Sequence, residues 1–134
     1  KGIDAGALEA DPLQIAQPVA RRYQSIVVMT GAEDYITDGH TTYLCRNGHP
    51  MMAKVSGTGC MLSAMIAAYC AANPENHLEA TAAAVCAFGL AGELAYDKLL
   101  KHDGGTSSYR TYLIDAVSKI DAEALKGGAK IETR

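Results

Sequence analysis

The sequence has no tryptophan, one phenylalanine and four prolines, and it has no excess of basic residues. Twelve Lys and Arg against 15 Asp and Glu give a formal net charge of -3. Binding to nucleic acid or to an anionic membrane draws on a basic surplus, so we expect neither as a partner. The chain shows no uninterrupted apolar run of about 20 residues, the length of a membrane-spanning helix, and no basic-then-apolar signal segment opens it.

The spacing of the cysteines argues against two common uses. The four cysteines stand at positions 45, 60, 70 and 86, without a CxxC pair and without a nearby His/Cys cluster. Neither a zinc site nor a disulfide framework is therefore indicated. Unpaired thiols fit a reducing compartment, and the sequence predicts a cytoplasmic protein.

What the chain does contain suits one folded domain. Its 134 residues are 49% hydrophobic and 20% charged, which is an ordinary composition for a globular protein. A chain of this length has room for one domain with a sizeable core. It opens on Lys1 rather than on Met, from which we expect a chain that begins in mid-protein.

Hydrophobic periodicity and turn residues predict alternating helices and strands. Apolar residues on one helical face, with Arg21 and Arg22 in the last turn, predict a helix over residues 12–23. The β-branched run at 25–30 predicts a strand buried on both faces, and Asp38-Gly39 predicts a hairpin turn. The other expected elements are strands at 35–37, 41–45 and 53–55, helices at 60–72 and 77–101, and a last helix after 107.

Several residues are expected to mark the ends of these helices. Asn76 and Glu79 resemble a capping box, Gly104-Gly105 would close the long helix, and Ser107 or Ser108 would cap the last one. Residues 124–134 are expected to form a flexible tail. This order of elements predicts the α/β class, with too few strands to cover all of its helices.

The most informative segment for chemistry is Gly57-Thr58-Gly59-Cys60, at the start of a predicted helix. Two glycines one residue apart let backbone N–H groups approach a ligand, and the helix dipole favours an anion there. The segment has neither the GK[ST] of a P-loop nor the third glycine of a dinucleotide fingerprint. A tight turn without a ligand also fits the residues.

Cys60 lies where first-turn N–H groups would stabilise a thiolate. The alternative is that it packs as a small hydrophobic residue, and we favour that interpretation for the other three cysteines. Thr30, at the carboxyl end of the predicted buried strand, could contact a phosphate oxygen or merely end the strand. Glu33, Asp34 and Asp38 are expected in solvated turns, with metal binding as the less favoured alternative, and the four histidines are expected in exposed positions.

Four segments together resemble the C-terminal half of the hydroxyethylthiazole kinase family. They are residues 27–31, 34–39, 46–50 and 56–63, and both their order and the spacing between Thr30 and Cys60 match. Residues 91–93 and 113–116 are similar to that family as well, so the resemblance covers nearly the whole chain.

The resemblance implies a ribokinase-like, three-layer αβα fold with a central, mainly parallel sheet, in which residues 1–134 are the C-terminal portion of a single kinase domain. It implies an enzyme that uses ATP and Mg²⁺ to phosphorylate the alcohol of 4-methyl-5-(2-hydroxyethyl)thiazole in thiamine biosynthesis or salvage. Thr30 matches the threonine that contacts ATP phosphate, and Gly57 matches a glycine of the thiazole site. Cys60 stands where most ribokinase-like kinases have an Asp general base, and it would assist catalysis by accepting the alcohol proton.

The same resemblance implies partners. The family is typically a homotrimer with active sites between subunits, and it runs to roughly twice this length. A missing N-terminal half would supply further strands, most of the thiazole pocket and an ATP-contacting Arg. Two positions depart from the family: Ala32 replaces a Glu, which leaves the metal ligands unassigned unless Glu33 substitutes, and residues 105–109 replace Gly-Pro-Gly-Ser-Phe.

Three alternatives stay open. Another ribokinase-like kinase, such as a hydroxymethylpyrimidine kinase, would normally have Asp at the position of Cys60. A cysteine-nucleophile hydrolase or acyltransferase would need an oriented His base, which no histidine here supplies by its placement. A non-catalytic fragment would show no nucleotide-induced change in melting temperature.

Overall fold

The computed structural model describes residues 11–134. Lys1, from which we expected a chain that begins in mid-protein, lies outside this range. The described elements, in chain order, are α1 (Pro12–Tyr23), β1 (Val27–Met29), β2 (Asp34–Thr37), β3 (Thr42–Cys45), the 3-10 helix η1 (Pro50–Lys54), α2 (Thr58–Ala72), α3 (His77–His102), α4 (Thr106–Lys119), α5 (Ala122–Gly128) and β4 (Ile131–Thr133).

The strands form one four-stranded sheet in the order β1-β2-β3-β4, and every described pair is antiparallel. Short turns join β1 to β2 and β2 to β3, whereas a parallel pair needs a crossover of a dozen or more residues. The α/β class is confirmed. The mainly parallel sheet that the family resemblance implies is not what these four strands form.

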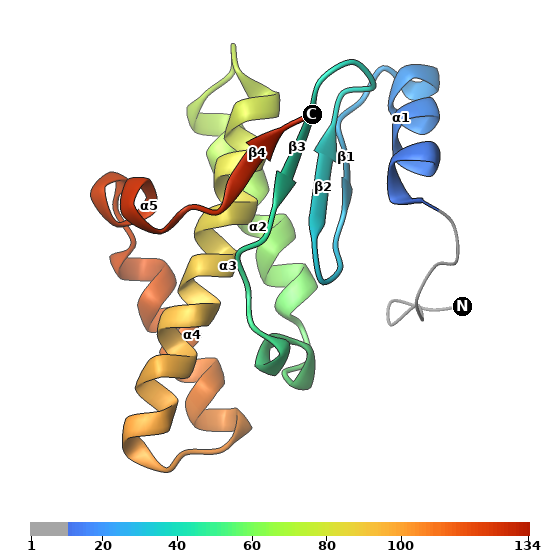
Figure 1. The fold of residues 1–134 in the computed structure, drawn as a ribbon. Helices are drawn as coiled ribbons and strands as arrows, with labels where there is room; N and C mark the ends of the chain where they lie inside the picture. Colours follow the sequence, from blue (N-terminus) through green and yellow to red (C-terminus); the bar gives the residue numbers. More distant parts are fainter. Residues whose placement is uncertain (1–10) are drawn as a thin grey trace.

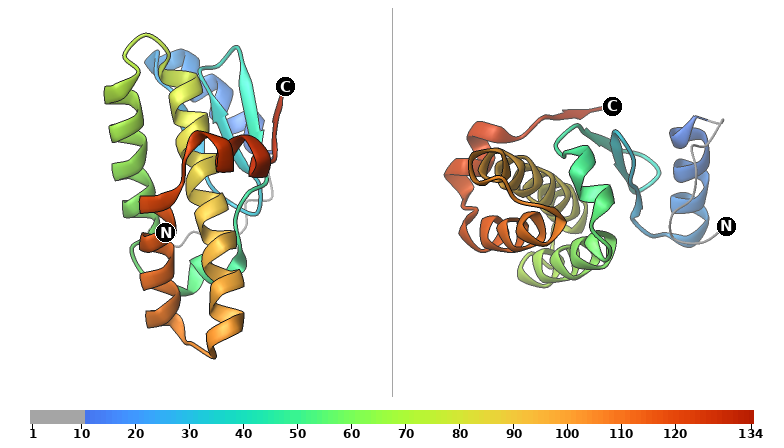
Figure 2. Two further views of the ribbon diagram at one scale, coloured as in Figure 1. Left: turned by 90° about the vertical axis from the view of Figure 1, so that its left-hand side faces the viewer. Right: turned by 90° about the horizontal axis from the view of Figure 1, so that it is seen from below.

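The molecule has three layers, with the sheet between helices (Figures 1 and 2). Helix α1 packs on one face against β1 and β2, and α3 packs on the other face against β2 and β3. Helices α2, α4 and α5 in turn contact α3. The register places Ile36 opposite Tyr43 and Asp34 opposite Cys45, so Asp34, Ile36 and Cys45 share the face that meets α3.

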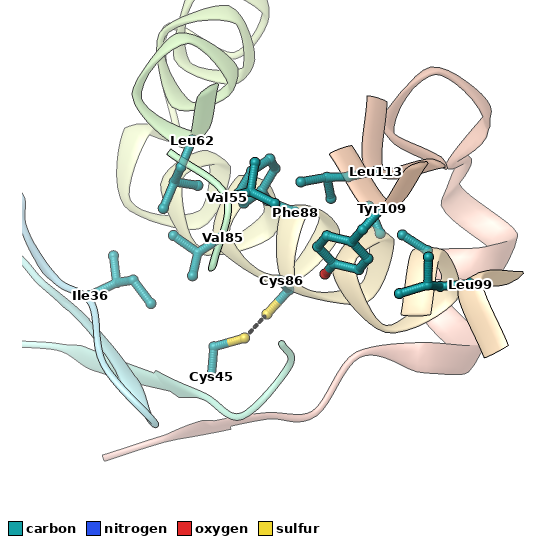
Figure 3. Packing of buried hydrophobic residues seen from close by; sticks show 12 residues of the cluster. Ile36, Cys45, Val55, Leu62, Val85, Cys86, Phe88, Leu99, Tyr109 and Leu113 are labelled. Carbon is teal, nitrogen blue, oxygen red and sulfur yellow. Dashed lines mark hydrogen bonds between the residues drawn. The ribbon is translucent and has the colours of Figure 1, made fainter. Parts of the chain in front are cut away.

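Helix α3 is the centre of the core. It is the one described helix that is long and apolar enough to cross a membrane, but 78% of its apolar stretch is buried inside the structure, which is the pattern of a core helix. Tyr109 and Leu113 of α4 are fully buried against it, and the Tyr109 hydroxyl donates to the Gly92 carbonyl at 3.0 Å. On the sheet side the Cys86 thiol donates to the Cys45 sulfur at 2.9 Å (Figure 3).

Several sequence predictions are confirmed. Helix α1 has the predicted bounds, because Asp11 caps it by accepting the Leu13 N–H at 3.0 Å and Pro12 suits its first turn. The hairpin of β2 and β3 turns at Asp38-Gly39, where Gly39 adopts a φ of 96°.

The burial expected for the first strand is corrected. Strand β1 is half-buried rather than buried on both faces, because it lies at an edge of the described sheet.

Other predictions are corrected. The strand expected at 53–55 is replaced by η1, which begins at Pro50. Asn76 makes no capping hydrogen bond from its side chain, so the expected capping box does not form. Asp103, not a glycine, ends α3 in the left-handed conformation, and α4 begins after Gly105 rather than at a serine cap.

The expected flexible tail at 124–134 is corrected as well. Its first part belongs to α5, which Asp121 caps by accepting the Ala124 N–H at 2.8 Å. Its last part is β4, which pairs with β3 so that Ile131 lies opposite Cys45. The segment therefore supplies the fourth strand of the described sheet.

Candidate functional site

A cavity of about 550 Å³ opens between one end of the sheet and the helices. Four parts of the chain line it: the turn between β1 and β2, the loop after β3 with η1, the start of α2, and the middle of α3. The lining residues are Thr30, Gly31, Ala32, Asp34, Asn47, Gly48, His49, Pro50, Met52, Ala53, Thr58, Gly59, Leu62, Val85, Phe88 and Gly89.

The start of α2 forms an open wall of this region, which we define as residues 57–60. Gly57 is the N-cap at a φ of 92°, and no side chain caps the helix there. A Cβ added to Gly57 or to Gly59 would meet no atom within 4 Å. Because the first N–H groups of a helix lack partners within it, this wall can offer donors and a positive dipole end to an anion.

Thr58 fixes the position of this wall. Its hydroxyl lies 3.3 Å from the Met52 carbonyl oxygen and 3.4 Å from the Val55 carbonyl oxygen, and it donates to this end of η1. Its side chain is therefore engaged within the protein, and its backbone is the part left to a ligand.

The structure brings together most of the residues that the sequence analysis singled out. Thr30, Thr58 and Gly59 line the same cavity, although 28 positions separate Thr30 from Thr58. Gly57 and Cys60 are exposed and stand beside the lining, in the same turn as Gly59. The Cys60 thiol makes no hydrogen bond to any residue in the described part of the chain.

Asp34 is a cavity residue that the sequence analysis placed in a turn. Its carboxylate accepts the Gly31 N–H at 2.9 Å and so holds the turn that carries Thr30. Burial raises the pKa of Asp34 to about 6, although the hydrogen bond from the Gly31 N–H acts to lower it. A signal was present in the sequence, since Asp34 is in phase with Ile36 on the buried face of β2.

Glu33 is not among the residues that line the cavity. It forms an ion pair with Arg46 at 2.7 Å and accepts the Tyr35 hydroxyl at 3.2 Å. The hydrogen bond from Arg46 is the largest cause of a lowered pKa at Glu33. Of these two neighbouring carboxylates, only Asp34 faces the lining.

Another part of the cavity lining consists of Asn47, Gly48 and Gly89, and we call these three residues, together with Glu93, which binds two of them, the clamped wall. The Asn47 amide donates to the Gly128 carbonyl at 2.9 Å and to Glu93 at 3.2 Å, and its oxygen accepts the Lys130 N–H at 2.7 Å. Glu93 also accepts the Gly48 N–H at 2.9 Å. These residues were not predicted as part of a site, because their partners lie far away in the sequence.

His49 continues this side of the cavity. Its ring stacks on Tyr96 with the ring centroids 3.6 Å apart, and its Nδ1 accepts the Met51 N–H at 3.1 Å. An accepting Nδ1 fixes the neutral ring as the Nε2–H tautomer.

Within residues 11–134, no group of three or more His, Cys, Asp or Glu side chains could hold a metal ion by itself. No Lys or Arg is among the residues that line the cavity either. An anion would therefore be met by backbone N–H groups and the Thr30 hydroxyl. A magnesium ion fits only together with a ligand that brings its own oxygens, as nucleotide phosphates do.

The structure is thus an α/β fold in which a glycine-rich helix start and a threonine line one cavity. The chain belongs to the hydroxyethylthiazole kinase family, whose family model matches residues 1–123.

Individual relatives agree with this assignment. The hydroxyethylthiazole kinase of Clostridium acetobutylicum is 44% identical, over 99% of this chain and 51% of the relative. That of Methanosarcina mazei is 38% identical, over 98% of this chain and 49% of the relative. The structure of the hydroxyethylthiazole kinase from Pyrococcus horikoshii superposes with a TM-score of 0.79 at 30% identity, over 90% of this chain and 45% of that one. The chain thus spans about half the length of the curated relatives it matches.

Proposed function

We propose that the protein transfers the γ-phosphoryl group of ATP to the hydroxyl of 4-methyl-5-(2-hydroxyethyl)thiazole, in thiamine biosynthesis or salvage. The observation that carries the proposal is the meeting of Thr30 with the uncapped start of α2 at one cavity. The relatives are hydroxyethylthiazole kinases by name, which supports the thiazole alcohol as the acceptor.

Each site residue then has a role. The Thr30 hydroxyl holds a nucleotide phosphate, and the N–H groups of residues 57–60 form an anion hole for the transferring phosphoryl group. Phosphoryl transfer depends mainly on positioning and on charge stabilisation, and one well-placed donor contributes about 3 kcal/mol. Gly57, which leaves open space beside the cavity, borders the thiazole.

Cys60 takes the proton. The alcohol oxygen attacks the γ-phosphorus, the bond from that phosphorus to the β–γ bridging oxygen breaks to release ADP, and the hydroxyl proton passes to the Cys60 thiolate. Cys60 suits this role because it is exposed in the same helical turn as Gly59, which lines the cavity. General-base assistance of this kind contributes about 10²–10⁴-fold.

A kinase of this family uses a nucleotide, and we propose that it is ATP accompanied by Mg²⁺. When bound, the ion neutralises charge on the phosphates. The cavity is compatible with such a pair, because it combines donors from the backbone and Thr30 with one carboxylate, that of Asp34.

We further propose that the site is completed by the other half of the enzyme and by neighbouring subunits of a homotrimer. Among the described strands, β1 pairs on one side only, with β2, so its other edge can receive a further strand. The chain's coverage of about half of each relative supports the same view. The four free cysteines support a reducing, cytoplasmic location.

The alternatives have less support. A hydroxymethylpyrimidine kinase would normally have Asp at the position of Cys60. For a cysteine-nucleophile enzyme, no described histidine hydrogen-bonds Cys60, and His49 is occupied by Tyr96 and the Met51 N–H. The third alternative, a non-catalytic fragment, is tested by the activity assay below.

A mass-detected assay with Mg-ATP and the thiazole alcohol tests the proposal, with an ATP-free control. The chain is assayed alone and again with the half of the Clostridium acetobutylicum relative that it does not cover. We expect a product heavier by one phosphoryl group, and a larger yield with the added half. No product in either arm would contradict the proposal, and an acylated Cys60 with a reactive ester probe would favour the hydrolase.

A further inference from the structure

Cys45 and Cys86 are a pair of thiols that no step of the proposed function uses. Cys45 ends β3 and Cys86 lies in the middle of α3, 41 positions away, and both are free and buried. The Cys86 thiol donates to the Cys45 sulfur at 2.9 Å, and Figure 3 shows the two sulfurs facing each other between the sheet and the helix. Because a disulfide bond is about 2.05 Å long, the sulfurs need to close by less than an ångström to be joined.

The hydrogen bond within the pair gives the two sulfurs different reactivities. It is the largest cause of a lowered pKa at Cys45 and the largest cause of a raised pKa at Cys86. A thiolate therefore forms more readily at Cys45, and the thiolate is the form that reacts with oxidants. Cys86 stands beside it as the second thiol. This is the arrangement of an attacking cysteine with a resolving cysteine.

The other two cysteines lack such a neighbour in the described part of the chain. Cys60 is exposed, and no hydrogen bond joins its thiol to another sulfur. The Cys70 sulfur lies 3.4 Å from the Thr81 hydroxyl and 3.8 Å from the His77 carbonyl oxygen. A sulfenic acid with a thiol beside it condenses to a disulfide, whereas one without such a neighbour is oxidised further or reacts with an outside thiol.

Because both sulfurs of the pair are buried, an oxidant reaches them through a local opening. The C-terminal segment of α5 and β4 pairs with β3 so that Ile131 lies opposite Cys45, and α5 has no buried residue. Segments with few buried contacts open more readily than the core does. A small oxidant such as a hydroperoxide suits this route better than a bulky one.

We propose that Cys45 and Cys86 are a modification site, at which hydrogen peroxide oxidises the two thiols to a reversible disulfide that joins β3 to α3. The Cys45 sulfur attacks a peroxide oxygen, the O–O bond breaks, and the released hydroxide leaves as water with the thiol proton. The Cys86 sulfur then attacks the sulfur of the Cys45 sulfenic acid, the S–O bond breaks, and a second water leaves with the Cys86 proton. The two sulfurs lose two electrons in all, and one peroxide is reduced to two water molecules. This inference does not rest on the proposed function.

The disulfide closes residues 45–86 into a covalent loop that carries much of the cavity. This loop includes the open wall and, from the clamped wall, Asn47 and Gly48. Cys86 lies one helical turn before Gly89, which packs against the Asn47 backbone, so the new bond lies close to that contact. A cross-link that closes a long loop restricts the unfolded chain and so stabilises the fold.

Peptide mapping without reduction tests the assignment on the folded protein, assembled as in the assay above and treated with hydrogen peroxide. Cleavage after Lys, Arg and Glu places Cys45 in residues 34–46 and Cys86 in residues 80–93, whereas Cys60 and Cys70 both fall in residues 55–75. Cys86→Ala removes the resolving thiol, and Cys60→Ala is the matched control. Melting temperatures are measured by circular dichroism before oxidation, after it, and after dithiothreitol.

We expect residues 34–46 to be linked to residues 80–93 in the wild type and in Cys60→Ala. The melting temperature of both should rise by about 5–10 °C on oxidation and return with dithiothreitol, and Cys86→Ala should show neither effect. A wild-type map in which Cys45 and Cys86 stay reduced while Cys60 is oxidised would overturn the proposal. Links made chiefly through residues 55–75 would overturn it as well, and this wild-type map decides even if Cys86→Ala fails to fold.

Discussion

The two walls of the cavity use glycine for opposite reasons. In the clamped wall, a Cβ on Gly89 would lie 2.5 Å from the Asn47 carbonyl oxygen, so glycine is what lets α3 and the loop after β3 touch. In the open wall, Gly57 and Gly59 have empty space where a Cβ would be. The first wall depends on glycine for packing and the second leaves room for a ligand. The residue type alone does not distinguish these two roles, but the surroundings do.

The largest effect on stability is expected from Gly89→Ala. The new methyl group would collide with backbone atoms of Asn47, which cannot rotate away as a side chain could, and this overpacking should cost about 3 kcal/mol of unfolding free energy. Urea denaturation followed by circular dichroism measures it. Gly127→Ala is the matched control, because a Cβ there meets no atom within 4 Å and alanine favours a helix. Equal stability of both variants would refute the close contact.

Gly57→Val should act mainly on activity. At a φ of 92° a side chain is strained by about 1–2 kcal/mol, so the start of α2 should reorient and its N–H groups should lose their aim at the phosphoryl group. We expect kcat/KM to fall about 100-fold, the loss typical of one anion-hole donor. The assay is run at a temperature where circular dichroism shows the variant folded. Gly59→Ala, at a position without a positive φ, should lose less. Full activity in Gly57→Val would remove residues 57–60 from the mechanism.

The fold was predictable where local residues determine the structure. Asp11 and Pro12 fix the start of α1, and Asp38-Gly39 fixes the hairpin, so these elements followed from the sequence. The strand expected at 53–55 failed, because the run offered no more than a few apolar residues and the turn at Pro50 continues through it as η1. Strand β4 was not predicted, for another reason. Its three residues show no pattern of their own, and their partner β3 lies more than 80 positions earlier.

The site divides in the same way. The open wall was predictable, because Gly57-Thr58-Gly59-Cys60 is one continuous segment before a helix, and Thr30 followed from its place after a strand. The clamped wall was not, since Asn47 meets Glu93, Gly128 and Lys130 only after the chain folds. Asp34 was assigned to a turn because its exposure depends on which face of β2 meets α3.

Cys60 is the residue of the open wall to which we assign the proton transfer, and its substitution should change turnover. If Cys60 is a proton acceptor that assists without being indispensable, turnover in Cys60→Ala should fall moderately, by about a hundredfold, the low end of the range for general-base assistance. Cys60→Asp should retain or raise turnover, because a carboxylate accepts the proton as well. Single-turnover measurements separate this step from product release. Cys45 cannot serve as a control because it is buried, whereas Cys70→Ala, in the same helix, should leave turnover unchanged. Complete loss of activity in both Cys60 variants would contradict the role.

The smallest effect is expected in the clamped wall, from Glu93→Gln. Burial tends to raise the pKa of Glu93, but hydrogen bonds from the Gly48 N–H, Lys130 and Asn47 outweigh it and lower the pKa below the usual 4.5. The stability that its charge provides is therefore fully present above pH 4.5 and is lost as the pH falls through the lower, folded-state pKa. Glutamine keeps an oxygen for Gly48 and loses the ion pair with Lys130, so the free energy of unfolding near pH 7 should fall by about 0.5–1 kcal/mol.

Urea denaturation at pH 7 and at steps below pH 4.5 tests this prediction. The midpoints of wild type and variant should converge as the pH falls. A difference that stays constant with pH would mean that the clamp depends on the shape of the Glu93 side chain and not on its charge.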